Sequence, residues 1–181
     1  MCCVTEASPT PGFFAYGGGL HNGVEPEIAE RKKPIVMSSS PAPLTVHAVD
    51  LAVPAKTRWE ALDLIGASLE RNGVVHAGYT DSLTARERRS STYLGHGIAV
   101  PHALHVHDYL LLNEGLLVTR FAEPVPWDGE AVTVAIAIAA SAAEHVEILC
   151  RLTATLLQPD HLETLNTSDA PAEIERIFRA T

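Results

Sequence analysis

The stretch "AVTVAIAIAASAAEHVEILCRLTATLL", residues 131–157, joins two different hydrophobic patterns within one segment. Val and Ile alternate with Ala in its first ten residues, a pattern typical of a buried β-strand. From Ser141 onward the apolar residues follow helical spacing, and Ser141 and Glu144 have the spacing of a helix capping box. A buried strand that leads directly into a helix indicates an α/β domain.

The rest of the chain also contains strand-like and helix-like segments. We expect strands at residues 92–95, 97–102 and 109–121, the last broken by a turn at 113–115, and a strand or short connection at 44–53. We expect further helices at residues 57–73, 77–88, 160–166 and 170–180. In the first of these, Thr57 and Glu60 form a second capping-box pair. This order predicts one compact α/β domain over residues 44–181, with a mixed central sheet covered by helices on both faces.

Length, composition and charge limit the class of protein. With 181 residues, 46% of them hydrophobic, the chain can bury one well-packed core. The net charge of −9 argues against a protein that binds nucleic acid through phosphate attraction. No signal-peptide pattern begins the chain, and the apolar run from Ala131 is too short to span a bilayer, so we expect a soluble cytoplasmic protein.

Residues 1–43 differ from the rest of the chain in composition. They hold six of the twelve prolines and five of the twelve glycines, so we expect a disordered N-terminal extension. Cys2, Cys3 and Cys150 have neither metal-ligand nor disulfide spacing. We expect Cys150 to be a small buried residue of its helix.

His102 ends the apolar run "GIAVPH", residues 97–102. Pro101 fixes its own φ angle and restrains Val100 to extended geometry, so the strand presents the His102 ring in a defined direction at the edge of the sheet. A neutral imidazole there suits a nucleophile, a general base or a metal ligand. A histidine that only caps the strand end through one backbone hydrogen bond would have the same sequence.

His145 and the cluster "ARERR", residues 85–89, add two features that suit an anion. The capping box places His145 in the first turn of a helix, among N–H groups without intrahelical partners, although a satisfied core histidine is the alternative. Arg86, Arg88 and Arg89 form either an anion clamp or a solvated helix end. Two neutral histidines, an arginine and a helix N-terminus suit a phosphoryl group, with one imidazole attacking in line.

The string "YTDSLTARERRSSTYLGHGIAVPHA", Tyr79–Ala103, with "EHVEIL" downstream, resembles the active-site stretch of a known family. These are the enzyme IIA domains of the mannitol/fructose class in the bacterial phosphoenolpyruvate-dependent sugar phosphotransferase system. The similarity runs from about Leu44 to the C-terminus. The resemblance implies a compact α/β phosphocarrier without a cofactor. Such a domain accepts phosphate from phospho-HPr on a histidine and passes it to a cysteine of enzyme IIB.

Matched by motif position, the resemblance assigns three residues. It implies that His102 is the phosphorylated nucleophile, that His145 is the second active-site histidine and stabilises the phosphoryl group, and that Arg86 clamps the phosphate. "TYLG" before "GIAVPH" is more similar to mannitol-specific members than to fructose-specific or nitrogen-regulatory ones. Ala103 departs from the family, which commonly has glycine there. The resemblance implies no nucleic-acid partner, and contact with the membrane only through the permease.

Two alternatives to a mannitol phosphocarrier stay open. A fructose-specific or nitrogen-regulatory relative would keep the same site, the latter acting by phosphorylation-dependent protein binding. A metal-binding hydrolase would use His102, His105 and His107, yet in an extended segment His105 and His107 share a face opposite to His102. Without a metal, we expect His105 and His107 to be surface histidines.

For the phosphocarrier, we expect Nε2 of His102 to attack while its other ring nitrogen donates to a backbone carbonyl. Because the nucleophile must be unprotonated, we expect transfer to weaken at acidic pH, so that the rate is not flat between about pH 5 and 8. We expect both partner proteins to dock on an apolar rim near residues 97–102.

Overall fold

The computed structural model describes residues 43–179, so the predicted extension at residues 1–43, with Cys2 and Cys3, lies outside the described residues except for Pro43. The elements are β1 (Val46–Val53), α1 (Arg58–Arg71), α2 (Tyr79–Arg89), β2 (Tyr93–Gly95), β3 (Ile98–Ala99), the 3₁₀ helix η1 (His105–Leu110), β4 (Gly115–Trp127), β5 (Glu130–Ala139), α3 (His145–Leu156), α4 (Pro159–Thr167) and α5 (Pro171–Arg179). Within the described part of the chain, no helix is both long and apolar enough to cross a membrane.

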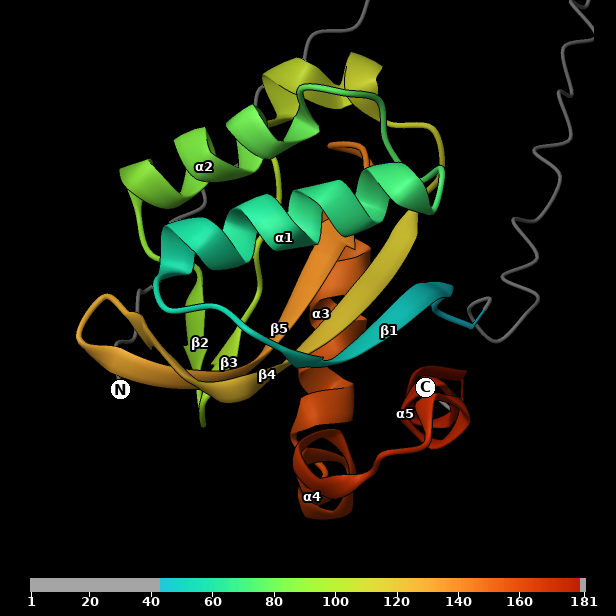
Figure 1. Cartoon of the computed structure of the whole chain (residues 1–181). Coiled ribbons are helices and arrows are strands. Elements are labelled where there is room, and N and C mark those ends of the chain that lie inside the picture. The colour runs from blue at the N-terminus through green and yellow to red at the C-terminus, as the bar shows by residue number, and fades with distance from the viewer. Residues whose placement is uncertain (1–42, 180–181) are drawn as a thin grey trace, which may run out of the picture. The chain divides into compact units, whose positions relative to one another are not determined.

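The five strands form one mixed sheet in the order β1-β4-β5-β3-β2. β1 runs parallel to β4 and β3 parallel to β5, whereas the β4–β5 and β2–β3 pairs are antiparallel. α1 and α2 cover one face of this sheet, and α3, α4 and α5 pack on the other (Figure 1). The predicted α/β fold, with a mixed sheet and helices on both faces, is therefore confirmed.

Small and large side chains alternate along β5, and the two sets belong to two separate hydrophobic clusters of the core. The alanines of the strand face α1 and α2, and its larger residues Val134, Ile136 and Ile138 face α3, α4 and α5. Both sets are almost completely buried, as expected for a central strand with helices on each side. The small side chains on the first face leave room for the large side chains of α1.

α1 begins and packs through specific contacts. Thr57 is the N-cap, and its hydroxyl accepts the Glu60 N–H at 3.2 Å, while the Glu60 carboxylate accepts the N–H of Lys56 rather than that of Thr57. Gly66 faces α2 so closely that a Cβ added there would lie 1.9 Å from Oγ1 of Thr80. A glycine is therefore required for the observed approach of α1 to α2.

Three predictions about local structure were wrong. Residues 105–110 form a 3₁₀ helix instead of extended chain, so the apolar run before the turn at 113–115 is not a strand. The Ser141 hydroxyl donates to Oε1 of Glu114 at 2.6 Å instead of capping the helix, and α3 begins at His145. Cys150 is exposed, because it lies two residues from buried Ile148, on the opposite side of α3.

Candidate functional site

The topology brings His102 and His145 together. His102 follows β3 and forms a parallel bridge with Ile138, whose N–H donates to the Pro101 carbonyl at 2.9 Å. β5 then leads through a short loop into α3, whose first residue is His145. The two ring centroids are 4.5 Å apart, and His145 is only 8% exposed, so it faces inward as expected.

Hydrogen bonds fix the tautomer of His102. Its Nδ1 lies 2.9 Å from the carbonyl oxygen of Val100. Because a carbonyl can only accept, Nδ1 carries the proton, and the neutral ring has its lone pair on Nε2. Nε of Arg86, from the last turn of α2, donates to this lone pair at 2.9 Å. The nitrogen expected to react is therefore the one that Arg86 covers.

Burial keeps both histidines neutral. Desolvation lowers the pKa of His102 from 6.5 to about 4. The hydrogen bond to the Val100 carbonyl favours the protonated ring and raises the pKa, but its effect is smaller. The pKa of His145 is also lowered, first by burial and then by the neighbouring His105 and Arg86. We had expected the transfer rate to change between about pH 5 and 8. With a pKa of about 4, His102 stays unprotonated throughout that range, so the change is expected at lower pH.

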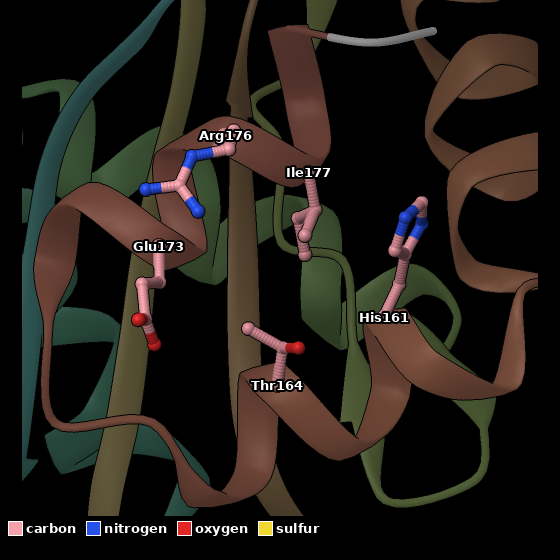
Figure 2. Close-up of a pocket in the computed structure, with 5 residues that line it drawn as sticks. All are labelled: His161, Thr164, Glu173, Arg176 and Ile177. Carbon is pink, nitrogen blue, oxygen red and sulfur yellow. The ribbon is translucent and has the colours of Figure 1, made fainter.

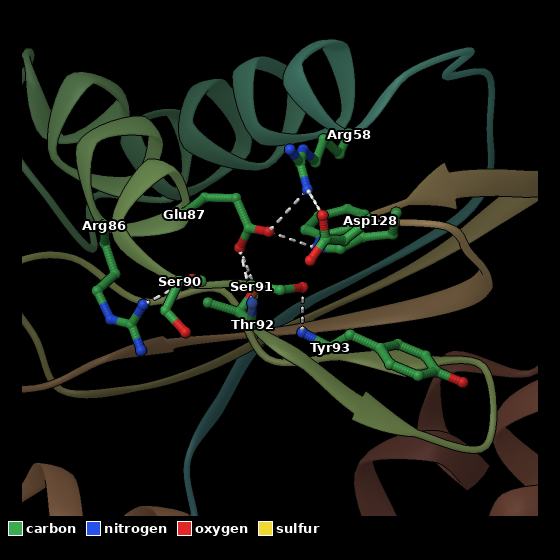
Figure 3. A network of polar contacts seen from close by, with 9 residues as sticks. Arg58, Arg86, Glu87, Ser90, Ser91, Thr92, Tyr93 and Asp128 are labelled. Atoms are coloured by element: carbon green, nitrogen blue, oxygen red, sulfur yellow. Dashed lines mark hydrogen bonds and ion pairs between the residues drawn. The ribbon is translucent and has the colours of Figure 1, made fainter.

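A buried carboxylate supports the segment that carries His102 (Figure 3). Glu87 follows Arg86 in α2, and its side chain is completely buried. It accepts hydrogen bonds from the N–H and hydroxyl of Thr92 and from Nε1 of Trp127 at 2.8 Å. Arg58 of α1 lies 3.7 Å from one carboxylate oxygen. Four donor groups thus surround Glu87, which is the arrangement that a buried charge needs.

The support continues from Glu87 to the reactive ring. The Thr92 carbonyl accepts the N–H of Val100 at 2.9 Å, and the Val100 carbonyl accepts Nδ1–H of His102. On the other side, Nη1 of Arg86 donates to the Ser90 carbonyl at 2.9 Å (Figure 3). Adjacent residues of α2 thus hold the two sides of the His102 ring. Sequence reasoning missed Glu87, since its partners Arg58 and Trp127 are distant in the chain.

A cavity of about 250 Å³ opens beside His102. Basic, hydroxyl and small side chains form its wall, namely Arg86, Arg89, Ser90, His102, Ala103, Leu104 and His105. The cavity has room for a phosphoryl group, and the guanidinium groups of Arg86 and Arg89 on its wall are hydrogen-bond donors. Ala103 is almost completely buried and adds little bulk to the wall.

The expectation that His105 and His107 are surface histidines is confirmed for His105, which is exposed, but not for His107, which is half-buried. His105 contacts the ring of His145, with centroids 5.0 Å apart, and its Nδ1 lies 3.6 Å from Oδ1 of Asp108. His107 points elsewhere, since its Nδ1 lies 2.8 Å from the Ser82 hydroxyl. His102, His105 and His107 do not converge, and residues 43–179 contain no group of three side chains placed to hold a metal ion. The geometry gives the metal-hydrolase alternative no support.

A second hollow, of about 260 Å³, lies between α4 and α5 (Figure 2). It is lined by His161, Thr164, Glu173, Arg176 and Ile177, none of which borders the cavity at His102. Two of its polar residues have structural partners: Nδ1 of His161 donates to the Thr155 carbonyl, and Glu173 accepts from Ser168. The hollow adds nothing to the chemistry of the histidine site.

Comparisons with known proteins agree with this geometry. The family model described as "Phosphoenolpyruvate-dependent sugar phosphotransferase system, EIIA 2" matches residues 42–180. A mannitol-specific phosphotransferase enzyme IIA component of Halalkalibacterium halodurans is 31% identical over 131 residues, 72% of this chain and 90% of that protein. A multiphosphoryl transfer protein of Xanthomonas campestris is 36% identical over 138 residues, 76% of this chain but only 16% of its own length.

Solved structures of related proteins have the same fold. Enzyme IIA mannitol of Escherichia coli, in a complex with phosphorylated enzyme IIB mannitol, matches with a TM-score of 0.68 and 27% identity over 75% of this chain and 96% of that one. The nitrogen regulatory protein IIA-Ntr of Neisseria meningitidis matches with a TM-score of 0.62 and 28% identity over 73% of this chain and 92% of that one. Both transporter-type and regulatory proteins thus resemble this chain.

Proposed function

Since the chain belongs to the type-2 enzyme IIA family of the phosphoenolpyruvate-dependent sugar phosphotransferase system, we propose that it carries a phosphoryl group on His102. It takes this group from phospho-HPr and passes it to a cysteine of an enzyme IIB. The observation that carries the proposal is Nε2 of His102: a lone pair on a neutral ring, at a cavity bordered by arginines. The family and this site make the chain a phosphotransferase component.

Transfer follows from the bonds at the His102 ring. The lone pair of Nε2 attacks phosphorus in line, the N–P bond of the donor histidine breaks, and its electron pair returns to the donor ring. Nδ1 keeps its proton on the Val100 carbonyl. The Arg86 N–H that covered Nε2 moves to a phosphoryl oxygen, and His145, next to His102, adds a further polar contact. Delivery to the enzyme IIB cysteine reverses these steps with sulfur as the nucleophile.

We propose mannitol as the sugar alcohol that this branch takes up. The similarity to mannitol-specific relatives and the "TYLG" sequence support this choice. The similarity to the nitrogen regulatory protein supports a second candidate function. In that case the protein is regulatory, and the phosphate is not passed on from His102. Transfer onward to enzyme IIB separates the two functions. Either function is carried out in the cytoplasm, where the phosphate donor is found.

Exposed apolar residues lie on η1 and α3, the elements that carry His105 and His145, and suit the docking of protein partners. Val106 and Tyr109 of η1 are 71% and 73% exposed, and Val146 of α3 is 65% exposed. Val106 adjoins His105, and Val146 adjoins His145. Apolar side chains around a polar centre are typical of interfaces that form and separate repeatedly. This rim differs from the one expected beside residues 97–102, because η1 and α3 provide it.

The test is phosphorylation with phosphoenolpyruvate, enzyme I and HPr. We expect acid-labile phosphate on the wild type and on His76→Ala, an exposed control histidine before α2, but none on His102→Ala. Addition of a mannitol-type enzyme IIB should then move the label to its cysteine. Label that stays on His102 would favour the regulatory function. Label on histidine in His102→Ala would contradict the assignment of the nucleophile.

A further inference from the structure

His105 borders the cavity beside His102 and is placed to contact a group bound to Nε2. The cavity wall includes both residues, and the rings of His102 and His105 both contact the ring of His145. His145 itself is not among the residues that line the cavity. His105, in contrast, is partly open to it, with 45% of its side chain exposed.

The carboxylate of Asp108 lies beside the His105 ring. Oδ1 of Asp108 lies 3.6 Å from Nδ1 of His105, and Oδ2 accepts the N–H of Ala142 at 2.9 Å. The carboxylate is thereby fixed between η1 and the loop before α3. A proton on Nδ1 faces this carboxylate and leaves Nε2 as a second N–H donor when the ring is charged. The charged groups and histidines around the ring are Asp108, His145, His102, Arg86 and Arg89.

Phosphorylation changes the charge balance of this cavity. A phosphoryl group adds about two negative charges where the unphosphorylated site has neutral His102 and His145. Arg86 and Arg89, both on the cavity wall, supply positive charge, and one N–H group of Arg86 already donates to the Ser90 carbonyl. A cationic His105 would supply a further positive charge at the same cavity, from η1 rather than from the last turn of α2.

We propose that His105 is a third phosphate-binding residue of the site. In the phosphorylated protein its Nε2–H donates to an oxygen of the phosphoryl group on His102, while Asp108 holds the protonated ring. His105 takes its proton from water as the phosphoryl group arrives, and returns it when the group leaves. This inference rests on the proposed phosphorylation of His102.

The experiment measures how phosphate distributes at equilibrium between HPr and this protein, at neutral pH, for four proteins. These are the wild type, His105→Ala, His105→Arg and the control His76→Ala. A hydrogen bond from a charged donor is worth about 1.5 to 3 kcal/mol, so His105→Ala should shift the distribution toward HPr by about tenfold or more. His105→Arg, which restores a charged donor, should recover most of the shift, and the control should match the wild type.

Nitrogen-15 spectra supply the second readout. Phosphorylation should convert the His105 ring of the wild type to the doubly protonated form, which a purely structural residue would not do. An unchanged distribution in a folded His105→Ala protein, or a His105 ring that remains neutral after phosphorylation, would overturn the proposal while leaving phosphorylated His102 intact. A wild type that takes up no phosphate at all would overturn both this inference and the proposed function.

Discussion

At the scale of single residues, the site depends on one ring whose two nitrogens have different partners. Val100 accepts from Nδ1 of His102, and Arg86 donates to Nε2. A backbone carbonyl at the other ring nitrogen was predicted for a phosphocarrier, and Val100 supplies it. The sequence alone could not predict that Arg86 covers Nε2, because that contact depends on how α2 packs beside β3.

The rate of phosphate uptake should not fall until the solution is strongly acidic. Desolvation lowers the pKa of His102 to about 4, so the ring is neutral above that value and gains a proton only as the pH falls through it. Single-turnover transfer from phospho-HPr, measured from pH 8 downward, should lose half its rate near pH 4. The same measurement with the phosphorylated donor alone corrects for its own stability. A midpoint near 6.5 would contradict the burial of His102.

Replacement of Arg86 by lysine should slow transfer by roughly ten- to a hundredfold, since an ammonium group cannot contact Nε2, Ser90 and phosphate oxygens with a planar fork. Rapid-quench kinetics would measure the change, with Arg88→Lys as the matched control from the same turn of α2. Unaltered kinetics in Arg86→Lys would show that Arg86 has no role in transfer and only binds the Ser90 carbonyl at the end of α2.

At the scale of helices and strands, patterns in the chain predicted most elements but not the segments that approach the site. Four of the five α-helices begin and end within about two residues of the predicted positions, because apolar spacing marks them. α3 starts late because Glu114 binds the Ser141 hydroxyl, a contact between distant segments. η1 was missed because short 3₁₀ turns have no distinctive periodicity, and with it the place of His105.

The close packing of α1 against α2 depends on Gly66. In Gly66→Ala the new methyl group would overlap Thr80, so we expect a loss of about 1 to 3 kcal/mol in the free energy of unfolding, despite the better helix propensity of alanine. Adding Thr80→Ala removes Oγ1, the atom at 1.9 Å, but keeps Cβ at 2.8 Å, so it should restore only part of the lost stability. Urea denaturation of both variants and of Thr80→Ala alone measures this. A Gly66→Ala protein as stable as the wild type would show that the helices separate easily.

Glu87 joins α2 to the start of β2 and should affect both stability and the His102 ring. Glu87→Gln places an amide N–H group against donors from Thr92 and Trp127, at an expected cost of about 2 to 4 kcal/mol. Loss of the Thr92 contact should also loosen the Val100 carbonyl and alter the nitrogen-15 signal of Nδ1 in His102. Chemical denaturation and this signal test the two effects. Glu70→Gln, on the exposed surface of α1, is the control.

At the scale of the whole molecule, buried neutral groups limit the range of pH over which the fold is stable. The pKa of His102 is lowered to about 4 by burial, so the unfolded chain, with a pKa near 6.5, binds more protons between these values. Stability should therefore fall as the pH decreases from 6.5 to 4. Desolvation raises the pKa of Tyr79 above 10.0, so stability should also fall as the pH rises beyond 10.

Thermal unfolding across this range should show a broad maximum between those two limits. His102→Gln removes one group that is forced to be neutral, and should make the acid side of the curve less steep. Tyr79→Phe should do the same on the alkaline side. If both variants had the slopes of the wild type, other groups would control the stability of the fold at extreme pH.

The bond from Arg86 to Nε2 also gives the resting protein chemical selectivity. A neutral acylating or alkylating reagent must break that bond, and it offers the guanidinium no anion in exchange. The phosphoryl group proposed for this site brings oxygens to which the same N–H group can move. His102 of the unphosphorylated protein is in this way protected from other electrophiles. The choice between a phosphoryl group and a neutral reagent is made at Nε2 itself and does not depend on recognition of the partner's surface.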